Sequence, residues 1–586
     1  MSYQGKVLRV NLSSGKVAQE PLNEEWVEKY YGGRGLGAKY LYEELKKGVD
    51  PLSPANKFIL TTGPFTGTMV PCSGKLAITT KSPATGRLLD CSIGGHFAGQ
   101  LKFAGYDVLI IEGQAKAPAY LLIEDDKVEI RKADQLWGKG IFETESQLNE
   151  EHGINASVLS IGPAGENLVS FACVGSELYR QAGRGGVGSV MGSKKLKAIV
   201  CSGSQSVSVP DMPRLLKLVK KLTKEDVYTD DNLWAYETGT SAIVDMSNSA
   251  GILPTRNYQD GVFEGAQKIN SDSLQKLQPK KKACFACSLG CGNYSSIKGS
   301  AVEGPEYETL ALAGSNCGVD DLKAIIQFNA ECDDLGLDTI STGNVLGFAM
   351  EMTERGIKDF GVRFGDIETY SKIPRLVAYQ KGVGEELSLG VKKLGEKYGT
   401  ADFGMQVKGL ELPGYDARGS WAMGLAYATA SRGGCHMSAW PIASEAFSDD
   451  IDPFTIEGKA QMVIDGQNPN AIKFSLILCD FWALSMETMS ELASCVFGRE
   501  VPVAEMEKAG ERIWNLLRLF NVREGFRAVD DSLPGRFFNE PLKSGTPAGR
   551  VLPRDQFDAM LKEYYQLCGW DEAGVPTPEK LKELEM

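Results

Sequence analysis

The stretch Ala198-Ile-Val-Cys-Ser-Gly-Ser-Gln-Ser-Val-Ser-Val-Pro210 separates two parts of the chain that have different sequence patterns. It starts as an apolar, strand-like run and continues with small residues, the composition of a linker between domains. Before it, short runs typical of strands prevail; after Pro213, apolar residues recur with the spacing of helices. The sequence therefore predicts an α+β fold in which a β-rich domain precedes mainly helical ones.

Residues 1–205 read mainly as strands and turns. Residues 5–12 alternate between apolar and polar side chains and are followed by Ser13-Ser-Gly-Lys-Val17, which predicts a β-hairpin. Further strands are expected at 57–62, 75–80, 107–112, 120–124 and 128–130. We expect few helices in this part.

Helices are expected to dominate from residue 206 onward. The apolar residues Leu215, Leu218 and Leu222, and later Val345, Phe348, Ala349 and Met352, keep helical spacing. A turn near Tyr398-Gly-Thr-Ala-Asp402 precedes a strand-like Met405-Gln-Val407 and suggests a second boundary. The predicted domains are 1–205, 206–405 and 406–586.

Composition excludes several classes of protein. The 586 residues contain 63 Lys plus Arg and 76 Asp plus Glu, a net charge of −13, which argues against binding to nucleic acid or an anionic membrane surface. We find no run of about 18 uncharged apolar residues and no signal-peptide pattern at the start, so a cytoplasmic protein outside the membrane is expected. In a reducing compartment, the 13 cysteines are not expected to form disulfides.

Three cysteines form the sharpest local motif. Lys280-Lys-Lys-Ala-Cys-Phe-Ala-Cys-Ser-Leu-Gly-Cys-Gly292 places Cys284, Cys287 and Cys291 in C-x₂-C-x₃-C spacing. Such a turn lets three thiolates approach one centre, either an iron–sulfur cluster or a structural zinc ion, and both need a fourth ligand. Cys479 is one of several candidates, and ordinary buried cysteines remain an alternative.

Other motifs are weaker when each is taken alone. Gly183, Gly185 and Gly188 form a G-x-G-x-x-G pattern, but no apolar strand precedes it, so a phosphate-binding backbone turn that includes Arg184 is preferred to a dinucleotide fold. His436 lies in the glycine-rich turn Ser431-Arg-Gly-Gly-Cys-His436, and Glu308 lies in Gly304-Pro-Glu-Tyr-Glu308. A lone histidine or a lone acid is more often structural or solvated.

Taken in order along the chain, these segments resemble the tungsten-containing aldehyde ferredoxin oxidoreductases. The resemblance extends over nearly the whole chain and rests on the opening strand at 5–12, Leu101-Lys-Phe-Ala-Gly-Tyr-Asp107, Ile161-Gly-Pro-Ala-Gly-Glu-Asn167, the glycine turn at 182–194, the cysteine loop, Gly304-Pro-Glu-Tyr-Glu308, residues 332–343, Arg432-Gly-Gly-Cys-His436 and Gly510-Glu-Arg-Ile-Trp-Asn515. It implies an N-terminal β-sheet domain that forms a base for a bis-pyranopterin cofactor, followed by two mainly α-helical domains.

The resemblance also implies the cofactors. Tungsten or molybdenum would be held by the dithiolene sulfurs of two pyranopterins, without a protein ligand, beside one [4Fe–4S] cluster. The cluster ligands would be Cys284, Cys287, Cys291 and Cys479; the distance to the segment at 510–515 favours Cys479 over Cys495.

Contacts to the pterins follow from matched motifs. The first pterin motif, D-x-x-G-L-D, is intact as Asp333, Gly336, Leu337 and Asp338. The second departs from the family pattern, because Phe474 and Ile477 replace its Asp and Gly ahead of Leu478 and Cys479. The remaining implied contacts are Lys75 in place of an arginine, the glycine turn of Gly183, Arg184 and Gly185, and carbonyl groups of Ser92 and Ala182 for a Mg²⁺ ion that bridges the pterin phosphates.

The activity that the resemblance implies is oxidation of an aldehyde with water to a carboxylic acid. Glu308 would act as general acid or base, and His436 would hydrogen-bond the aldehyde oxygen. Electrons would pass through the cluster to ferredoxin or to a small iron–sulfur subunit. Two alternatives are a tungsten subunit of a larger complex that reduces a carboxylate or a ring, and a zinc-stapled scaffold protein.

One feature of some relatives is missing. They hold a metal between two subunits with an E-x-x-H motif just before D-x-x-G-L-D, where this chain has Gln327-Phe-Asn-Ala330. Gln is a poor ligand and Ala is none, and Glu331 would face about 100° away around the helix. We therefore expect no bridging metal here, and a homodimer, if formed, would use other contacts.

Overall fold

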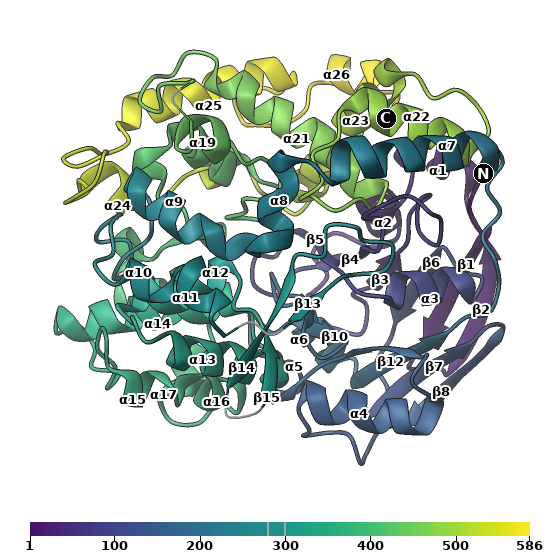
Figure 1. Ribbon diagram of the computed structural model, residues 1–586, viewed down its shortest axis with the longest axis horizontal. Coiled ribbons are helices and arrows are strands. Elements are labelled where there is room, and N and C mark those ends of the chain that lie inside the picture. Colours follow the sequence, from purple (N-terminus) through teal and green to yellow (C-terminus); the bar gives the residue numbers. More distant parts are fainter. Residues whose placement is uncertain (278–279, 298–299, 449) are drawn as a thin grey trace.

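The computed structural model describes residues 1–277, 280–297, 300–448 and 450–586. Two β-sheets from the N-terminal part lie on one side of the molecule, and the helices that follow cover the other side and the top (Figure 1). The N-terminal β-rich part and the helical remainder confirm the predicted α+β fold class.

The first sheet has six strands in the order β2-β1-β6-β3-β4-β5. Its strands are β1 (Lys6–Asn11), β2 (Lys16–Pro21), β3 (Phe58–Thr61), β4 (Leu76–Lys81), β5 (Leu88–Ile93) and β6 (Val108–Glu112). Strand β1 is antiparallel to β2, with Val10 opposite Val17, so the predicted hairpin is confirmed. On its other side β1 pairs in parallel with β6.

The second sheet also has six strands, in the order β11-β10-β9-β12-β7-β8. They are β7 (Ala119–Glu124), β8 (Lys127–Lys132), β9 (Ser157–Ser160), β10 (Val174–Ser176), β11 (Arg180–Ala182) and β12 (Leu196–Ser202). Leu8 and Ile78 of the first sheet share a buried apolar core with Leu121 and Ile199 of the second. The two sheets are therefore packed against each other through this core.

The N-terminal part contains more helix than its sequence predicted. Its helices are α1 (Glu24–Tyr30), α2 (Gly33–Glu44), α3 (Phe97–Phe103), α4 (Ile141–His152), α5 (Pro163–Glu166) and α6 (Val187–Ser193). Most of α2 is buried, and a Cβ on Gly37 would meet Thr79 Oγ1 of β4 at 2.4 Å. The sequence of α2 has glycines that allow this close packing and lacks the amphipathic pattern by which a surface helix is recognised. The helix was therefore not predicted.

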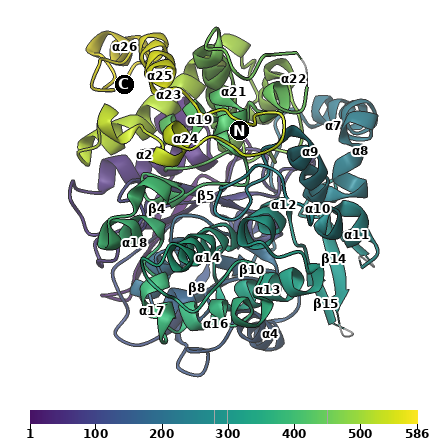
Figure 2. The same ribbon diagram turned by 90° about the vertical axis from the view of Figure 1, so that its left-hand side faces the viewer.

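Helices are the main secondary structure of the chain after the linker. They are α7 (Met212–Leu222), α8 (Asp230–Glu237), α9 (Ile243–Ala250), α10 (Ala266–Ile269), α11 (Ser271–Gln275), α12 (Tyr307–Thr309), α13 (Leu322–Leu335), α14 (Thr339–Glu354), α15 (Ile367–Tyr370), α16 (Ile373–Ala378), α17 (Val383–Leu387), α18 (Val391–Tyr398), α19 (Trp421–Thr429), α20 (Ile442–Glu445), α21 (Lys459–Ser475), α22 (Met486–Phe497), α23 (Val503–Arg523), α24 (Gly535–Asn539), α25 (Arg554–Cys568) and α26 (Pro578–Glu583). In Figure 2, α13, α14, α16 and α17 lie below the C-terminal helices, and α7 and α8 lie at one edge. Among the described residues, no helix is long and apolar enough to cross a bilayer.

Two small sheets interrupt the helical part. Strands β13 (Lys280–Lys282), β14 (Gly292–Ile297) and β15 (Ser300–Glu303) form an antiparallel sheet, and the cysteine loop joins its first two strands. Strands β16 (Gln406–Val407) and β17 (Leu410–Glu411) form a hairpin at the strand-like segment predicted there. The cysteine loop is thus held at both ends by paired strands.

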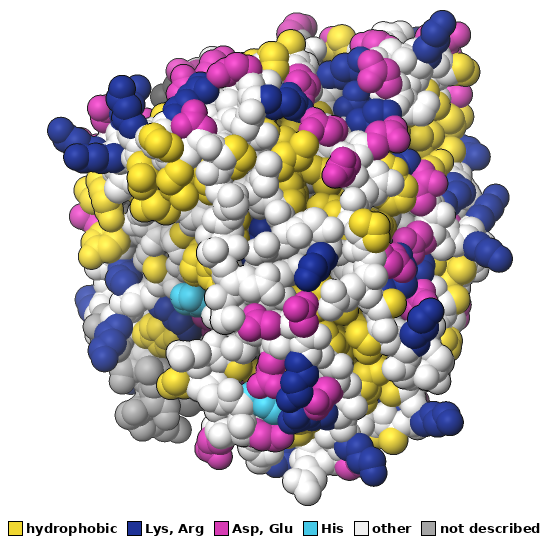
Figure 3. Space-filling view, turned by 90° about the vertical axis from the view of Figure 1, so that its right-hand side faces the viewer, with side chains coloured by type: hydrophobic (Ala, Val, Ile, Leu, Met, Phe, Trp, Pro, Cys, Tyr) yellow, Lys and Arg dark blue, Asp and Glu magenta, His cyan; other side chains and the backbone are white. Residues whose placement is uncertain are grey.

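Charge on the surface is mixed rather than segregated on the face that Figure 3 shows. Lys and Arg side chains alternate there with Asp and Glu side chains, and apolar side chains lie between them. The net charge of −13 is therefore not concentrated as one acidic field on this face.

Candidate active site

A cavity of about 1030 Å³ collects most of the predicted site residues. It is lined by Lys75, Ser92, Gly183, Arg184, Cys284, Cys287, Cys291, Glu308, Asp333, Leu337, Asp338, His436 and Cys479, among others. The remaining predicted contacts, Ala182, Gly185, Gly336 and Leu478, are chain neighbours of lining residues but do not themselves line the cavity. The lining combines residues from the β-rich part with residues from the helices on both sides of residue 405.

The cysteine loop folds back onto the N-terminal part. The N–H of Phe285 donates to Gly95 O at 3.1 Å, and the N–H of Cys287 donates to Cys284 O at 3.1 Å. Cys479 comes from a different element, the segment after α21. All four cysteines are free and partly exposed to the cavity. Within the described residues, no three His, Cys, Asp or Glu side chains converge closely enough to hold a single metal ion.

A fifth cysteine joins this group, and the sequence did not identify it. Cys72 is buried, yet it lines the same cavity, and its Sγ lies 3.9 Å from Cys287 Sγ. This contact lowers the pKa of the Cys287 thiol and, together with burial, raises the pKa of the Cys72 thiol. The only signal in the sequence was its place three residues before Lys75.

Lys75 lies at the cysteine end of the cavity. Its Nζ is 3.6 Å from Asp480 Oδ1. Burial lowers the pKa of Lys75, but the negative charges of Cys479 and Asp480 outweigh it and raise the pKa overall. Burial raises the pKa of Asp480, and Lys75 with Lys473 more than offsets that effect. The ammonium group of Lys75 therefore stays protonated and places a positive charge next to the cysteines.

Glu308 and His436 face each other across the cavity. Glu308 Oε2 accepts a hydrogen bond from the Gly414 N–H at 2.9 Å, and its Oε1 lies 3.8 Å from His436 Nε2. Burial raises the pKa of Glu308 to about 7, while the Gly414 amide and Arg184 partly offset it. Burial, and then the charges of Arg184 and Arg432, lower the pKa of His436 to about 3. The imidazole is therefore neutral near pH 7, where the carboxyl group can exchange a proton.

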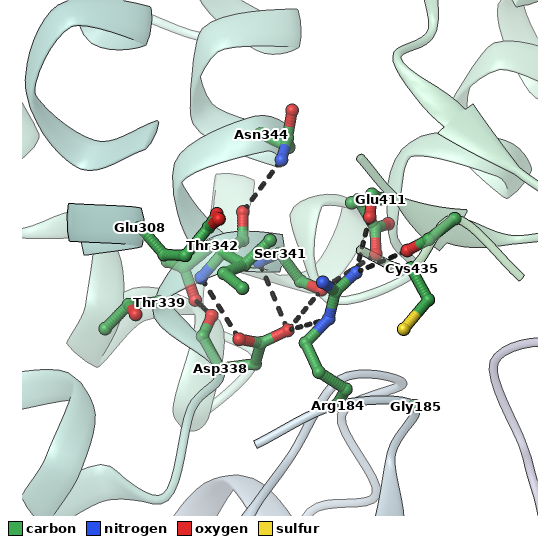
Figure 4. Close-up of polar contacts among 12 residues, drawn as sticks. Arg184, Gly185, Glu308, Asp338, Thr339, Ser341, Thr342, Asn344, Glu411 and Cys435 are labelled. Carbon is green, nitrogen blue, oxygen red and sulfur yellow. Dashed lines mark hydrogen bonds and ion pairs between the residues drawn. The ribbon is translucent and has the colours of Figure 1, made fainter. Parts of the chain in front are cut away.

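Arg184 connects the glycine turn to the helices. Its Nε is 3.2 Å from Asp338 Oδ2, and its Nη2 donates to the carbonyl of Glu411 (Figure 4). Asp338 caps α14 by accepting from the N–H groups of Ile340 and Ser341 at 3.1 and 3.3 Å. Asp338 therefore contacts both the start of α14 and the guanidinium of Arg184. It thereby fixes the glycine turn in position relative to α14.

Asp333 lies just before Gly336, which ends α13. Its Oδ2 accepts a hydrogen bond from Asn329 Nδ2 at 3.0 Å, and burial raises its pKa well above the ordinary value. Gly336 has φ of 75°, a left-handed conformation that glycine adopts without strain, and its carbonyl accepts from the Cys173 N–H at 2.9 Å. Asp333 therefore lines the cavity directly, and Gly336 fixes the backbone turn between the lining residues Asp333 and Leu337.

Several buried polar atoms of residues that line the cavity have no hydrogen-bond partner in the described part of the protein. Within the described part of the chain, Arg180 Nε and Nη2, Glu303 Oε2, Glu308 Oε1 and His436 Nδ1 make no hydrogen bond. Buried polar groups are normally paired, so their grouping around one cavity fits a large polar ligand. Arg180 Nη1 pairs with Glu303 Oε1 at 2.8 Å, and the two remaining nitrogens are donors that suit an anionic group such as phosphate.

Comparison with known proteins agrees with this chemistry. The sequence profile "Aldehyde ferredoxin oxidoreductase, N-terminal domain" matches residues 7–203, and that of "Aldehyde ferredoxin oxidoreductase, domains 2 & 3" matches residues 215–586. The chain belongs to the aldehyde ferredoxin oxidoreductase family. The expected resemblance is thereby confirmed.

Individual relatives of this oxidoreductase cover almost its full length. The tungsten-containing aldehyde ferredoxin oxidoreductases of Thermococcus kodakarensis and Pyrococcus horikoshii are each 42% identical to it, over 99% of this chain and 98% of theirs. A solved structure, the active site complex BamBC of benzoyl coenzyme A reductase with 1,5-dienoyl-CoA, matches with a TM-score of 0.87 and 25% identity, covering 100% of this chain and 97% of that one.

Phe474, which replaces the aspartate of the family's second pterin motif, packs against a buried arginine. The Phe474 ring lies 4.6 Å from the guanidinium of Arg34, and Phe474 is not among the residues that line the cavity. Arg34 in turn pairs with Asp90 at 2.7 Å in a fully buried position. The aromatic ring therefore stabilises a buried cation through its π face.

We predict that this oxidoreductase holds no metal at the position of the E-x-x-H motif. Gln327 is exposed on α13, and Glu331 already pairs with Arg375 Nε at 2.9 Å. A crystal of the metal-loaded protein should show no anomalous-scattering peak beside Gln327. An ordered metal ion there would contradict the prediction, and a Gln327→Glu, Ala330→His double variant that gains such a peak would serve as the positive control.

Proposed function

We propose that the protein is a tungsten-pterin oxidoreductase that oxidises aldehydes with water to carboxylic acids. The observation that carries this proposal is the pairing of Glu308 and His436 in a cavity that five cysteines also line, among them the four proposed cluster ligands. The tungsten-containing relatives, 42% identical over almost the whole chain, support the same activity. Tungsten or molybdenum would suit this site, because neither needs a ligand from the chain in the implied cofactor.

Residues of all three proposed domains would hold the cofactors. Domain 1–205 would lie under the pterins, and domains 206–405 and 406–586 would cover them. Asp333, Asp338 and Arg184 would bind the pterins, and the carbonyl groups of Ser92 and Ala182 would hold a bridging Mg²⁺. Cys284, Cys287, Cys291 and Cys479 would hold the [4Fe–4S] cluster.

The bound tungsten pterin would supply a two-electron acceptor, and the cluster would supply one-electron transfer to ferredoxin or a small iron–sulfur subunit. Oxidation of RCHO with H₂O to RCOOH releases two electrons and two protons. The carboxylate of Glu308 takes a proton from water, and its second oxygen stays fixed by the Gly414 amide. The neutral imidazole of His436 donates a hydrogen bond that orients the aldehyde oxygen.

Metal analysis and turnover together test this function. Protein purified without oxygen should contain tungsten or molybdenum and about four iron atoms per chain, and should reduce a viologen dye when an aldehyde is added. A different result would favour the larger complex that the similarity to BamBC suggests. In that case the protein with its full metal content would not oxidise aldehydes but would reduce a ring substrate once partner subunits are added. Zinc without iron would support the scaffold alternative.

We predict that aldehyde oxidation loses efficiency as the pH falls through about 7. A base must be unprotonated, and the raised pKa of Glu308 places its protonation near that value. His436, with a pKa near 3, stays neutral across this range and so does not add a second pH dependence to kcat/KM. Values of kcat/KM measured between about pH 5 and 9 should fall roughly tenfold per unit on the acid side. A flat profile in enzyme that retains its metals would contradict the assignment of the base.

A further inference from the structure

Cys72 lies between the two segments that carry the proposed cluster ligands. Its N–H donates to Ala286 O at 2.8 Å, inside the cysteine loop. Its carbonyl accepts from the N–H of Cys479 at 2.9 Å. These two backbone hydrogen bonds place Cys72 next to Cys479 and next to the residue before Cys287, although the three segments are far apart in the sequence.

The backbone of Cys72 directs its thiol at one neighbour. The residue has φ of 58°, a left-handed conformation that is uncommon for a side chain other than glycine. In this conformation its Sγ lies 3.9 Å from Cys287 Sγ, within the range of a sulfur hydrogen bond. Cys72 is only 2% exposed, so water does not compete for the thiol.

Counting ligands indicates which sulfur carries the proton. A [4Fe–4S] cluster takes four cysteine thiolates, and the cysteine loop with Cys479 supplies them. The fifth sulfur then remains a thiol, which can donate, while Cys287 as a thiolate can only accept. Hydrogen bonds to cluster sulfurs are one of the factors that set the reduction potential of such clusters.

We propose that the Cys72 thiol donates a hydrogen bond to Cys287 Sγ and thereby raises the reduction potential of the cluster. The hydrogen bond draws negative charge from the ligand sulfur and so favours the reduced, more negative cluster over the oxidised one. Cys72 is a positioning residue, since it acts through Cys287. This inference rests on the proposed cluster.

The test compares Cys72→Ala and Cys72→Ser with the unmodified enzyme by redox titration followed with electron paramagnetic resonance. Cys72→Ala should keep full iron content and shift the midpoint about 30 to 60 mV negative, a threefold to tenfold change in the ratio of oxidised to reduced cluster. Cys72→Ser keeps a donor on a shorter bond and should fall between the two. Cys201→Ala removes a buried thiol from β12 and should leave the midpoint unchanged.

The outcomes separate this inference from the proposed function. Unmodified protein without an iron–sulfur cluster would refute the proposed function itself. Full iron with an unchanged midpoint in Cys72→Ala would refute only the hydrogen bond. Loss of iron in Cys72→Ala would show that Cys72 is a ligand rather than a donor, and would also overturn the proposal.

Discussion

Replacing Glu308 with Gln is expected to lower kcat for aldehyde oxidation at least about a hundredfold. Gln keeps the shape of the side chain and can still face His436, but its amide takes up no proton. Because the loss affects the chemical step, kcat and kcat/KM should fall together while tungsten and iron stay bound. Steady-state kinetics and metal analysis of the same preparations provide the measurement.

Glu145 offers a matched control for this substitution. Its carboxyl is also buried, with a pKa raised to about 7 by burial, but it lies on α4, outside the cavity, and accepts from the Leu178 N–H at 2.7 Å. Glu145→Gln should therefore leave kcat unchanged. If Glu308→Gln retains more than about a tenth of kcat, another group must move the proton; if it loses metal, Glu308 has a structural role.

Local patterns explain which parts of the fold the sequence predicted. The hairpin of β1 and β2 depends on alternation and a turn within one short segment, so it could be read directly. Helix α7 likewise presents one apolar face, with Leu215 and Leu222 buried. Helix α2 was not predicted from the sequence. It is buried on nearly all sides, so it has no amphipathic pattern, and its glycines allow neighbouring elements to pack closely against it.

Contacts between distant segments explain what the sequence could not show. The order β2-β1-β6-β3-β4-β5 is set by packing of the whole sheet, and no single segment encodes it. The cysteine loop was visible because its spacing is local, whereas Cys479 was singled out only through the family resemblance. Cys72 was missed because its partner, Cys287, is 215 residues away and neither neighbouring sequence marks the contact.

The second large effect is expected at Cys479. Cys479→Ser should lower the iron content, because a cluster that needs four thiolates would keep only three. Cys479 lines the cavity, and its backbone is tied to Cys72, which contacts the loop that carries the other three cysteines. Iron per chain and the visible absorption of the cluster, compared with unmodified enzyme, provide the measurement.

Cys495→Ser is the control, since this cysteine is the nearest alternative in sequence. It is fully buried on α22, its carbonyl accepts from the Asp211 N–H at 3.2 Å, and it does not line the cavity. The substitution should leave iron content and absorption unchanged. Equal iron in both variants would contradict the assignment of Cys479. Loss confined to Cys495→Ser would require a cluster on the far side of α22, where the structure places none of the other proposed ligands.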